Sequence, residues 1–160
     1  MIEVRFHGRG GQGAVTATRI LANAFVKQGK YGSSFPMFGF ERRGAPVTAF
    51  MRFDDNPIRV KTQIYNPDCL VVLDPSQLNS PDIYEGLKPK GVLIQNAAQQ
   101  IHESPHRHIG LLGVVDAETI AMEELGFPSP NTCVLGAFAA VTGAISSRKI
   151  CEPLRGVSMR

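Results

Sequence analysis

The residues most suited to ligand chemistry lie near the N-terminus, where four glycines and a glutamine fall within six positions. These are Gly8, Gly10, Gly11, Gln12 and Gly13. The spacing Gly-x-Gly-x-x-Gly follows an alternating apolar segment at residues 2–7 and precedes a helical apolar pattern at residues 14–27. In that context a glycine loop lets the backbone approach a phosphate, which the first N–H groups of the helix attract. The loop is a candidate site for a dinucleotide or another phosphate-bearing ligand.

Two explanations of these glycines remain open. A nicotinamide-binding unit needs a second strand soon after the helix, with an acidic residue near its end that binds the ribose. Residues 31–40 are instead rich in glycine, serine and phenylalanine and are predicted to form a loop. The first acid after them, Glu41, follows no clear strand. We therefore favour close packing of strand, loop and helix, or docking against a partner chain, over a bound dinucleotide.

Residues 30–46 combine aromatic and charged side chains in a way that is typical of an interface. The candidate interface residues are Phe35, Phe38, Phe40, Glu41, Arg42 and Arg43. Long irregular connections usually have a functional or interface role, and arginine is enriched at protein interfaces. A local salt bridge on a surface loop is the alternative. The interface hypothesis predicts that alanine at Arg42 and Arg43 weakens assembly with a partner.

For the other polar candidate residues, we favour structural roles over ligand binding. Asp74 and Asp116 each follow a predicted strand, where ligands bind in open α/β sheets, but aspartate also caps a following helix well. We favour capping for both. His106 and His108 are separated by one residue, with no carboxylate or cysteine partner in the local pattern. A surface loop is therefore favoured over a metal site.

The three cysteines do not indicate a cofactor in this chain. Cys69, Cys133 and Cys151 are odd in number and far apart, which is not typical of a disulfide framework. No Cys-x-x-Cys occurs, so we expect neither an iron–sulfur cluster nor a structural zinc. We predict no catalytic residue and no metal ligand in this chain.

Composition excludes several classes of function. A chain of 160 residues suits one domain with a real core. The net charge of +3 comes from scattered basic residues and not from a basic stripe, which argues against nucleic-acid binding. No apolar run is long enough to span a membrane, and no signal peptide is visible. We expect a cytoplasmic protein.

The predicted elements alternate between strands and helices. Such alternation predicts a mainly parallel sheet covered on both faces, with one antiparallel hairpin inserted. The predicted strands are residues 2–7, 47–53, 58–64, 69–73, 92–95 and 111–115, and the hairpin joins 47–53 to 58–64. The predicted helices are residues 14–27, 81–87, 117–125 and 132–144. Residues 146–160 are predicted to form an irregular tail after a domain of residues 1–145.

With these residues in view, the sequence resembles the gamma subunits of 2-oxoacid:ferredoxin oxidoreductases. The similarity covers approximately residues 2–145 in one order, and its middle block is more specific than the glycine loop. It is carried by Phe6-His7-Gly8-Arg9-Gly10-Gly11-Gln12-Gly13-Ala14, Ser34-Phe35-Pro36, Phe38-Gly39, Glu41-Arg42-Arg43-Gly44-Ala45-Pro46, Pro57-Ile58-Arg59, Asn66-Pro67-Asp68, Asp74-Pro75, Val115-Asp116-Ala117 and Pro130-Asn131-Thr132.

The resemblance implies a single Rossmann-like three-layer α/β domain and a role inside a larger enzyme. Such enzymes convert a 2-oxoacid and coenzyme A to an acyl-CoA, carbon dioxide and reduced ferredoxin. Alpha and beta subunits supply thiamine diphosphate and magnesium, and a delta subunit supplies iron–sulfur clusters. This chain lacks the Gly-Asp-Gly pattern expected of the thiamine diphosphate site, so it would be a non-catalytic subunit that completes the assembly and helps to seat coenzyme A at residues 8–13.

The middle block, Phe35-Pro36 with Glu41-Arg42-Arg43-Gly44-Ala45-Pro46, favours pyruvate as the substrate, with branched-chain 2-oxoacids second. Two alternatives stay open, a stand-alone dinucleotide-binding oxidoreductase and a binding module with no enzymatic assembly. Without its partners, the aromatic segment of residues 31–40 can drive self-association of the isolated chain.

Overall fold

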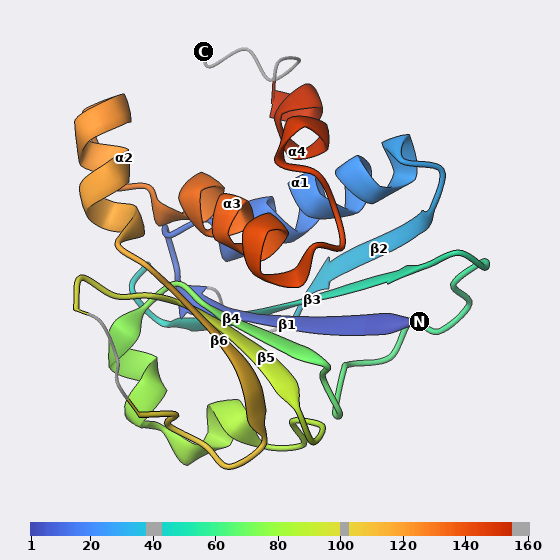
Figure 1. Ribbon diagram of the computed structural model, residues 1–160, viewed down its shortest axis with the longest axis horizontal. Coiled ribbons are helices and arrows are strands. Elements are labelled where there is room, and N and C mark those ends of the chain that lie inside the picture. The colour runs from blue at the N-terminus through green and yellow to red at the C-terminus, as the bar shows by residue number, and fades with distance from the viewer. Residues whose placement is uncertain (38–42, 100–102, 155–160) are drawn as a thin grey trace.

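A computed structural model describes residues 1–37, 43–99 and 103–154, the last three of these as backbone only. Figure 1 shows helices stacked on one side of a twisted sheet. The strands are β1 (Ile2–Arg9), β2 (Tyr31–Pro36), β3 (Pro46–Asp54), β4 (Cys69–Val72), β5 (Gly91–Asn96) and β6 (Ile109–Val115). The helices are α1 (Ala14–Lys27), α2 (Ala117–Leu125), α3 (Pro130–Thr142) and α4 (Ser147–Leu154), with the short 3₁₀ helices η1 (Pro75–Asn79) and η2 (Pro81–Tyr84).

The sheet is mixed, with the strand order β2-β3-β1-β4-β5-β6. The pairs β1–β4, β4–β5 and β5–β6 are parallel, whereas β3 runs antiparallel to both β1 and β2. The predicted α/β class with a mainly parallel sheet is therefore confirmed. The antiparallel element is also present, but it is made by other residues than those predicted.

The predicted hairpin between residues 47–53 and 58–64 is wrong in its second half. Residues 58–64 form no strand, and of their apolar side chains Ile64 is buried while Val60 is exposed. The physical reason is that a strand has only two edges, and β3 uses both, one on β1 and the other on β2. Pro57, which has no N–H to donate, also disfavours strand pairing there.

Strand β2 occupies residues 31–36 of the loop that was predicted for residues 31–40, and residues 38–40 lie outside the described residues. Its alternation is hidden in the sequence because one face carries small residues. Gly32 lies so close to the backbone of Ala22 in α1 that a Cβ there would come within 2.6 Å of the Ala22 carbonyl oxygen. On the opposite face, Phe35 packs against Phe50 of β3, with ring centroids 5.2 Å apart. The close approach of α1 explains why glycine is used in an edge strand.

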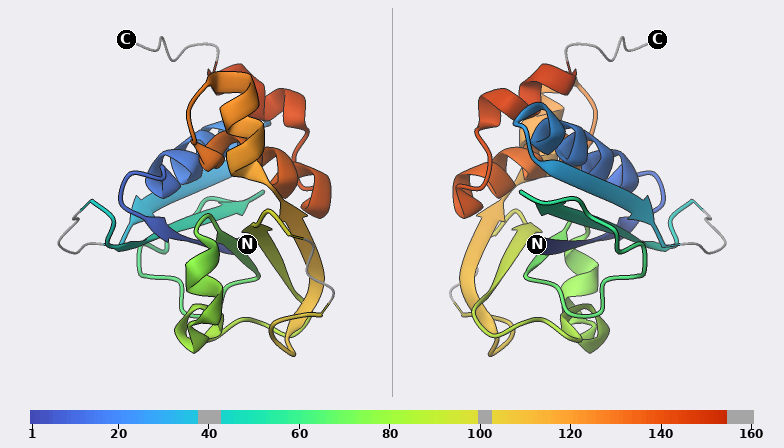
Figure 2. Two further views of the ribbon diagram at one scale, coloured as in Figure 1. Left: turned by 90° about the vertical axis from the view of Figure 1, so that its left-hand side faces the viewer. Right: turned by 90° about the vertical axis from the view of Figure 1, so that its right-hand side faces the viewer.

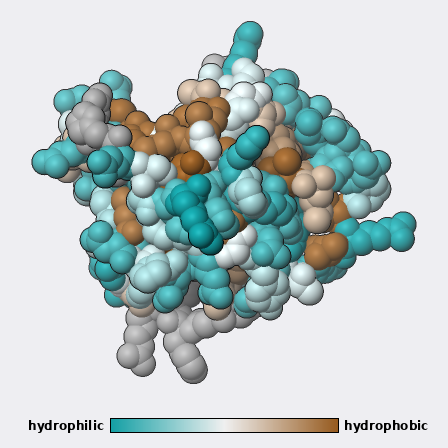
Figure 3. Space-filling model, turned by 60° about the horizontal axis from the view of Figure 1, so that its bottom comes forward, coloured by the Kyte–Doolittle hydropathy of each residue, from teal (hydrophilic) through white to brown (hydrophobic). Residues whose placement is uncertain are grey.

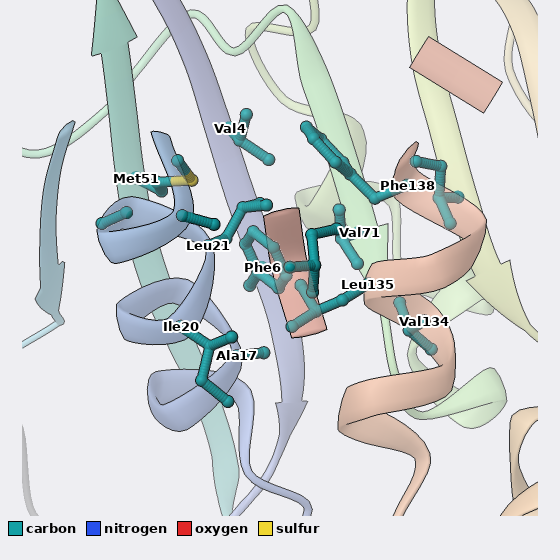
Figure 4. Close-up of a cluster of buried hydrophobic side chains, with 14 of the residues drawn as sticks. Val4, Phe6, Ala17, Ile20, Leu21, Met51, Val71, Val134, Leu135 and Phe138 are labelled. Atoms are coloured by element: carbon teal, nitrogen blue, oxygen red, sulfur yellow. The ribbon is translucent and has the colours of Figure 1, made fainter. Parts of the chain in front are cut away.

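The main core lies between the sheet and the helices α1, α3 and α4. In Figure 4 the even-numbered residues of β1, Val4 and Phe6, point toward α1 and α3, where Leu21, Leu135 and Phe138 meet them. The two side views in Figure 2 show these helices on one side of the sheet. Burial of apolar surface at about 25 cal/mol per Å² makes this layer the main source of stability.

The opposite face of the sheet has a thinner cover. Leu70 and Val72 of β4 pack there against Ile83, Tyr84 and Leu87, which belong to η2 and the turn after it. Figure 2 shows this segment, in green, on the side away from the helices. Because this cover lies over the parallel strands, the predicted three-layer arrangement is present. The third layer consists of 3₁₀ helices, whereas residues 81–87 were predicted to form one helix.

The end of the described chain also differs from the prediction of an irregular tail. Ser147–Leu154 forms α4, which packs on α1 and α3. The side chain of Ile150 is buried in the main core together with Ile145. The prediction of a tail followed from Pro153 and the several charges of this segment, and of the α4 side chains that the structure describes only Ile150 is buried. In the residues that the structure describes, no helix is long and apolar enough to cross a membrane.

Candidate functional site

The glycine loop lies at the carboxyl end of β1, as predicted, and leads directly into α1. Gly11 and Gly13 have φ values of 100° and 79°, a left-handed conformation that glycine adopts without strain. Gln12 closes the turn, because its side-chain oxygen accepts a hydrogen bond of 2.7 Å from the N–H of Arg9. A Cβ atom at Gly13 would overlap the side chain of Asn131 in α3. Packing of strand, loop and helix therefore explains part of the glycine pattern.

The start of α1 has the features of an anion-binding helix terminus. Gly13 is the N-cap, so no side chain caps the first N–H groups, and the first turn has no acidic residue. A pocket of about 300 Å³ lies against this terminus. Its lining includes Gly10, Gly11, Ala14, Val15 and Thr16. The geometry suits a small anionic group, such as a phosphate, held by backbone N–H groups.

Arg9 does not serve as a free cation for such a group. Its Nε forms an ion pair with Asp74, its Nη2 donates to Ser76 Oγ at 2.9 Å, and its Nη1 donates to the carbonyl of Gly44 at 3.1 Å. Partial burial acts to raise the pKa of Asp74, but hydrogen bonds from Ser76 and Arg9 outweigh it, and the net pKa is lowered. Arg9 is thus a structural link between three segments.

The structure brings the glycine loop together with part of the predicted interface segment. The N–H of Gly10 donates to Ala45 O at 2.9 Å, and the N–H of Gly44 donates to Gly10 O at 3.1 Å. Arg43, which precedes this contact, is exposed. Phe38, Phe40, Glu41 and Arg42 lie outside the described residues. Phe35 is half-buried on β2, where the guanidinium of Arg52 lies 5.6 Å from its ring centroid.

The topology does not supply the strand that a nicotinamide site needs. In such a site the second strand lies next to the first and ends in an acid close to the glycine loop. Here β3 lies between β1 and β2, and the residues that end β2 are Phe35 and Pro36. The strand that follows α1 therefore brings no acid to the loop, and Asp74, which follows β4 beside β1, is already engaged by Arg9 and Ser76.

Asp74 and Asp116 cap helices, as predicted. Asp74 accepts a hydrogen bond of 2.9 Å from the N–H of Ser76 at the start of η1, and Asp116 accepts one of 3.1 Å from Thr119 in α2. Asn96 at the end of β5 has a related role that the sequence did not reveal. It donates to the carbonyl of Leu73 and accepts from the N–H of Ala117. The sequence signal that could have predicted this role of Asn96 is a polar residue at the end of a buried strand.

The polar face of β1 contains a buried network that the sequence pattern also missed. Glu3, Arg5 and His7 alternate with apolar residues along β1, yet Arg5 and His7 are each only 8% exposed. Arg5 Nε donates to His7 Nε2 at 3.0 Å, and Arg5 Nη2 donates to two carbonyls of the η2 region. Burial and, secondly, the charge of Arg5 lower the pKa of His7 to about 3.

His106 and His108 hold a loop against η2. The ring of His106 stacks on Tyr84 with centroids 5.2 Å apart, and His108 Nδ1 lies 2.8 Å from the carbonyl oxygen of Leu87. Among the described residues, no three His, Cys, Asp or Glu side chains gather as metal ligands would. The three cysteines are free. The described side chains therefore do not fit a metal ion or an iron–sulfur cluster.

Comparison with known proteins identifies the family of this chain. The model of the family described as pyruvate ferredoxin/flavodoxin oxidoreductase matches residues 3–157. The chain belongs to this family. The match spans the glycine loop, the mixed sheet and the helices over it.

Individual relatives are similar over nearly the whole chain. The common gamma subunit of the pyruvate/ketoisovalerate oxidoreductases of Thermococcus kodakarensis is 54% identical over 97% of this chain and 85% of its own length. The pyruvate synthase subunit PorC of Methanothermobacter thermautotrophicus is 52% identical over 91% of this chain and 79% of its own. The crystal structure of the pyruvate oxidoreductase subunit PORC of Thermotoga maritima superposes with a TM-score of 0.86 at 38% identity, covering 99% of this chain and 86% of that one.

Proposed function

We propose that this chain is the gamma subunit of a multisubunit enzyme that converts a 2-oxoacid, coenzyme A and oxidised ferredoxin to an acyl-CoA, carbon dioxide and reduced ferredoxin. Its partners are alpha, beta and delta subunits. The observation that carries the proposal is 54% identity, over 97% of the chain, to a relative named as a common gamma subunit of such oxidoreductases. The family match over residues 3–157 supports the same role for the whole domain.

The chain acts as a non-catalytic subunit in this proposal. Thiamine diphosphate with its magnesium ion and the iron–sulfur clusters belong to the partners, because the described side chains of this chain offer no cluster of ligands for them. Cofactors carry out the decarboxylation and electron transfer, and a protein contributes to those steps by binding and positioning. The gamma subunit then completes the assembly around cofactors that other chains hold.

Pyruvate is the first substrate we propose, and branched-chain 2-oxoacids are the second. The names of the relatives support this order, since they include pyruvate synthase and pyruvate/ketoisovalerate oxidoreductases. A gamma subunit common to two such enzymes suits a chain without catalytic residues, because the substrate would be selected by the subunits that hold thiamine diphosphate.

Coenzyme A binding is the ligand role that the glycine loop suits best. Coenzyme A carries phosphates, and the uncapped start of α1 offers backbone N–H groups beside a pocket of about 300 Å³. The proposal is that Gly8, Gly10, Gly11, Gln12 and Gly13 help to seat a phosphate of coenzyme A. A stand-alone dinucleotide-binding oxidoreductase is disfavoured, because β2 does not lie next to β1 and brings no acid to the loop for a ribose.

Exposed apolar side chains support assembly with partners over a lone binding module. In α2 the buried side chains are only Ala117 and Ala121, whereas Ile120, Met122 and Leu125 are 41%, 49% and 41% exposed. Figure 3 shows hydrophobic patches between hydrophilic ones on the face it presents. Exposed apolar patches typically mark interfaces. The aromatic and arginine residues of 35–43 form a second proposed contact: Phe35, Phe38, Phe40, Glu41, Arg42 and Arg43.

The proposal is tested by affinity purification of the tagged chain from anaerobic lysate of its native cells. The eluate is assayed for coenzyme A-dependent reduction of a viologen dye with pyruvate, 2-oxoisovalerate and 2-oxoglutarate. We expect co-purified subunits that carry iron–sulfur clusters, and activity with pyruvate above that with 2-oxoisovalerate, with little for 2-oxoglutarate.

A second sample, eluted from cells that express the tag alone, controls for enzyme that binds the resin. An eluate that contains this chain without partners, without iron and without activity would favour the binding module. Activity confined to 2-oxoglutarate would contradict the substrate proposal while leaving the subunit role intact.

A further inference from the structure

A second pocket, unrelated to the glycine loop, lies on the sheet face away from the helices. It has a volume of about 450 Å³, within the range of small-molecule sites. The floor is formed by the adjacent strands β1 and β3, where Arg5 pairs with Phe50 and His7 pairs with Thr48. The walls come from the segment before β4 and from η1 and η2. Arg5, His7 and Gln77 line it although each is at most 9% exposed, so the pocket is built around buried polar groups.

Arg5 fixes the shape of the pocket through its Nε and Nη2 groups. Its Nη2 donates to the carbonyl oxygens of Ile83 at 2.6 Å and Glu85 at 2.9 Å, which ties the η2 region to the sheet. Two carboxylates, Asp82 and Glu85, line the same pocket and offset the guanidinium charge. An anionic ligand would face these carboxylates, and a cationic one would face Arg5. An uncharged ligand fits this balance.

His7 presents a hydrogen-bond donor to the pocket. A guanidinium can only donate, so the bond from Arg5 Nε makes His7 Nε2 an acceptor and places the ring proton on Nδ1. No described residue pairs with this Nδ1. The imidazole stays neutral near pH 7 because its burial and the charge of Arg5 lower its pKa to about 3.

Gln77 presents an acceptor. Its Nε2 donates to the carbonyl oxygen of Gly8 at 2.8 Å, which fixes the orientation of the amide. Its Oε1 is buried and has no hydrogen-bond partner in the described part of the chain. An unpaired buried acceptor costs about 1–3 kcal/mol, so a donor brought by a ligand would be favourable. Apolar side chains complete the lining: Met37, Pro46, Phe50, Ile64 and Ile83.

We propose that this pocket binds an uncharged amide attached to an apolar group. The amide N–H donates to Gln77 Oε1, the amide carbonyl accepts from His7 Nδ1–H, and the apolar group packs against Phe50 and Ile64. The amide belongs either to a free small molecule or to a segment of a partner subunit. The first arm of the test below does not depend on the proposed function.

The first arm measures binding of simple probes to the full chain. Benzamide carries the amide, acetophenone lacks the donor, benzoate is anionic and benzamidine is cationic. We expect benzamide to bind about tenfold more tightly than each of the others, since one or two hydrogen bonds of roughly 1 kcal/mol distinguish them. Nitrogen-15 spectra of the histidine rings should show the His7 Nδ1 resonance shifting with benzamide and staying in place with benzamidine, which has no carbonyl to accept from His7.

Gln77→Met, which removes the acceptor at similar volume, should abolish the preference for benzamide over acetophenone. Gln28→Met, at an exposed glutamine that forms the C-cap of α1, is the matched control and should keep it. If Gln77→Met does not fold, the probe series and the His7 resonance on the unaltered chain decide the question. Benzamide binding no tighter than acetophenone, or an unmoved His7 resonance, overturns the proposal.

The second arm identifies the source of the amide and rests on the proposed function, because it uses the assembled oxidoreductase. If a partner segment supplies the amide, the complex should not bind benzamide and the free chain should. If a small molecule supplies it, both should bind benzamide. Failure to obtain a complex would count against the proposed function and would leave the first arm unaffected.

Discussion

Arg9 shows how one side chain can organise the edge of a sheet without binding a ligand itself. Each of its three guanidinium nitrogens has a partner, and the partners belong to the segment before β3 and to the start of η1. Asp74, at the end of β4, therefore serves two purposes, as the cap of η1 and as the counter-ion of Arg9. Because the guanidinium of Arg9 already has these partners, we expect the glycine loop to hold an anion through backbone N–H groups.

Thr16 allows the electrostatics of that loop to be tested at a single residue. It is exposed in the first turn of α1 and lines the pocket beside the loop. Thr16→Asp should raise the apparent KM of the assembled enzyme for coenzyme A about fivefold, because a charge a few ångströms from a phosphate repels it by roughly 1 kcal/mol in water. The value of kcat should change little, since in the proposed assembly the reacting groups belong to other subunits. The measurement is the initial rate of viologen reduction against coenzyme A concentration.

The stability of the Thr16→Asp variant distinguishes electrostatic repulsion of coenzyme A from general damage to the fold. An acidic residue in the first turn stabilises a helix by about 0.3–1 kcal/mol, so the variant should unfold no more easily than the parent chain. Thr62→Asp, an exposed position in the segment before β4, is the matched control and should leave KM unchanged. Equal KM values for the two variants would refute coenzyme A binding at the loop.

At the scale of elements, the sequence predicted the parts whose patterns are local. Strand β1, helix α1 and the apolar strand β4 were predicted close to their observed bounds, and so were β5, β6, α2 and α3. Each has a local apolar pattern that does not depend on its neighbours, such as the two-residue period of β1, the helical period of α1 or the continuous apolar run of β4. The glycine loop and the capping aspartates followed from the same local rules, since they sit where a strand gives way to a helix.

The elements that were missed depend on pairing, which a local pattern does not contain. Residues 58–64 alternate as a strand would, but both edges of β3 are already occupied. Residues 31–36 contain Gly32 and Ser34 on one face, and they form a strand because α1 packs closely over them. The buried network at Arg5 and His7 was missed for the same reason, since the segment that covers it comes from residues 63–85.

Helix α4 provides a prediction at this scale. Ile150 is buried against the main core, so Ile150→Ala should lower the free energy of unfolding by about 2–4 kcal/mol. Arg148→Ala, in the same helix but exposed, should change it by no more than about 0.5 kcal/mol. Urea-induced unfolding followed by circular dichroism measures both. A loss at Ile150 as small as that at Arg148 would show that α4 does not dock on α1 and α3.

At the scale of the whole molecule, the glycine loop and the segment of residues 43–46 lie against each other at one end of the sheet. The hydrogen bonds between Gly10, Gly44 and Ala45 hold this arrangement. A subunit that docks through residues 35–43 would therefore press on the loop as well. In the proposed assembly, ligand binding at the loop and contact with a partner share one edge of the molecule.

The interface is tested with the double variant Arg42→Ala and Arg43→Ala. We expect the tagged variant to recover less than about a third of the partner subunits that the parent chain recovers, because arginine contacts at interfaces often contribute 1 kcal/mol or more. Arg19→Ala with Arg148→Ala, two exposed positions on α1 and α4, is the control with the same loss of charge. Quantitative mass spectrometry of the eluates measures the ratio. Full recovery with the first pair and loss with the second would place the interface on the helical face instead.

The central position of β1 has a consequence for how the chain is made. The first strand to be synthesised pairs with β3 and β4, so Val4 must wait for Met51 and Cys69 to emerge before its two neighbours exist. At roughly 5–20 residues per second this delay is several seconds, far longer than the microseconds in which a helix such as α1 can form. During translation, β1 therefore remains an unpaired strand with one apolar face next to an early helix, and chaperones that shield such strands have their main opportunity at this stage.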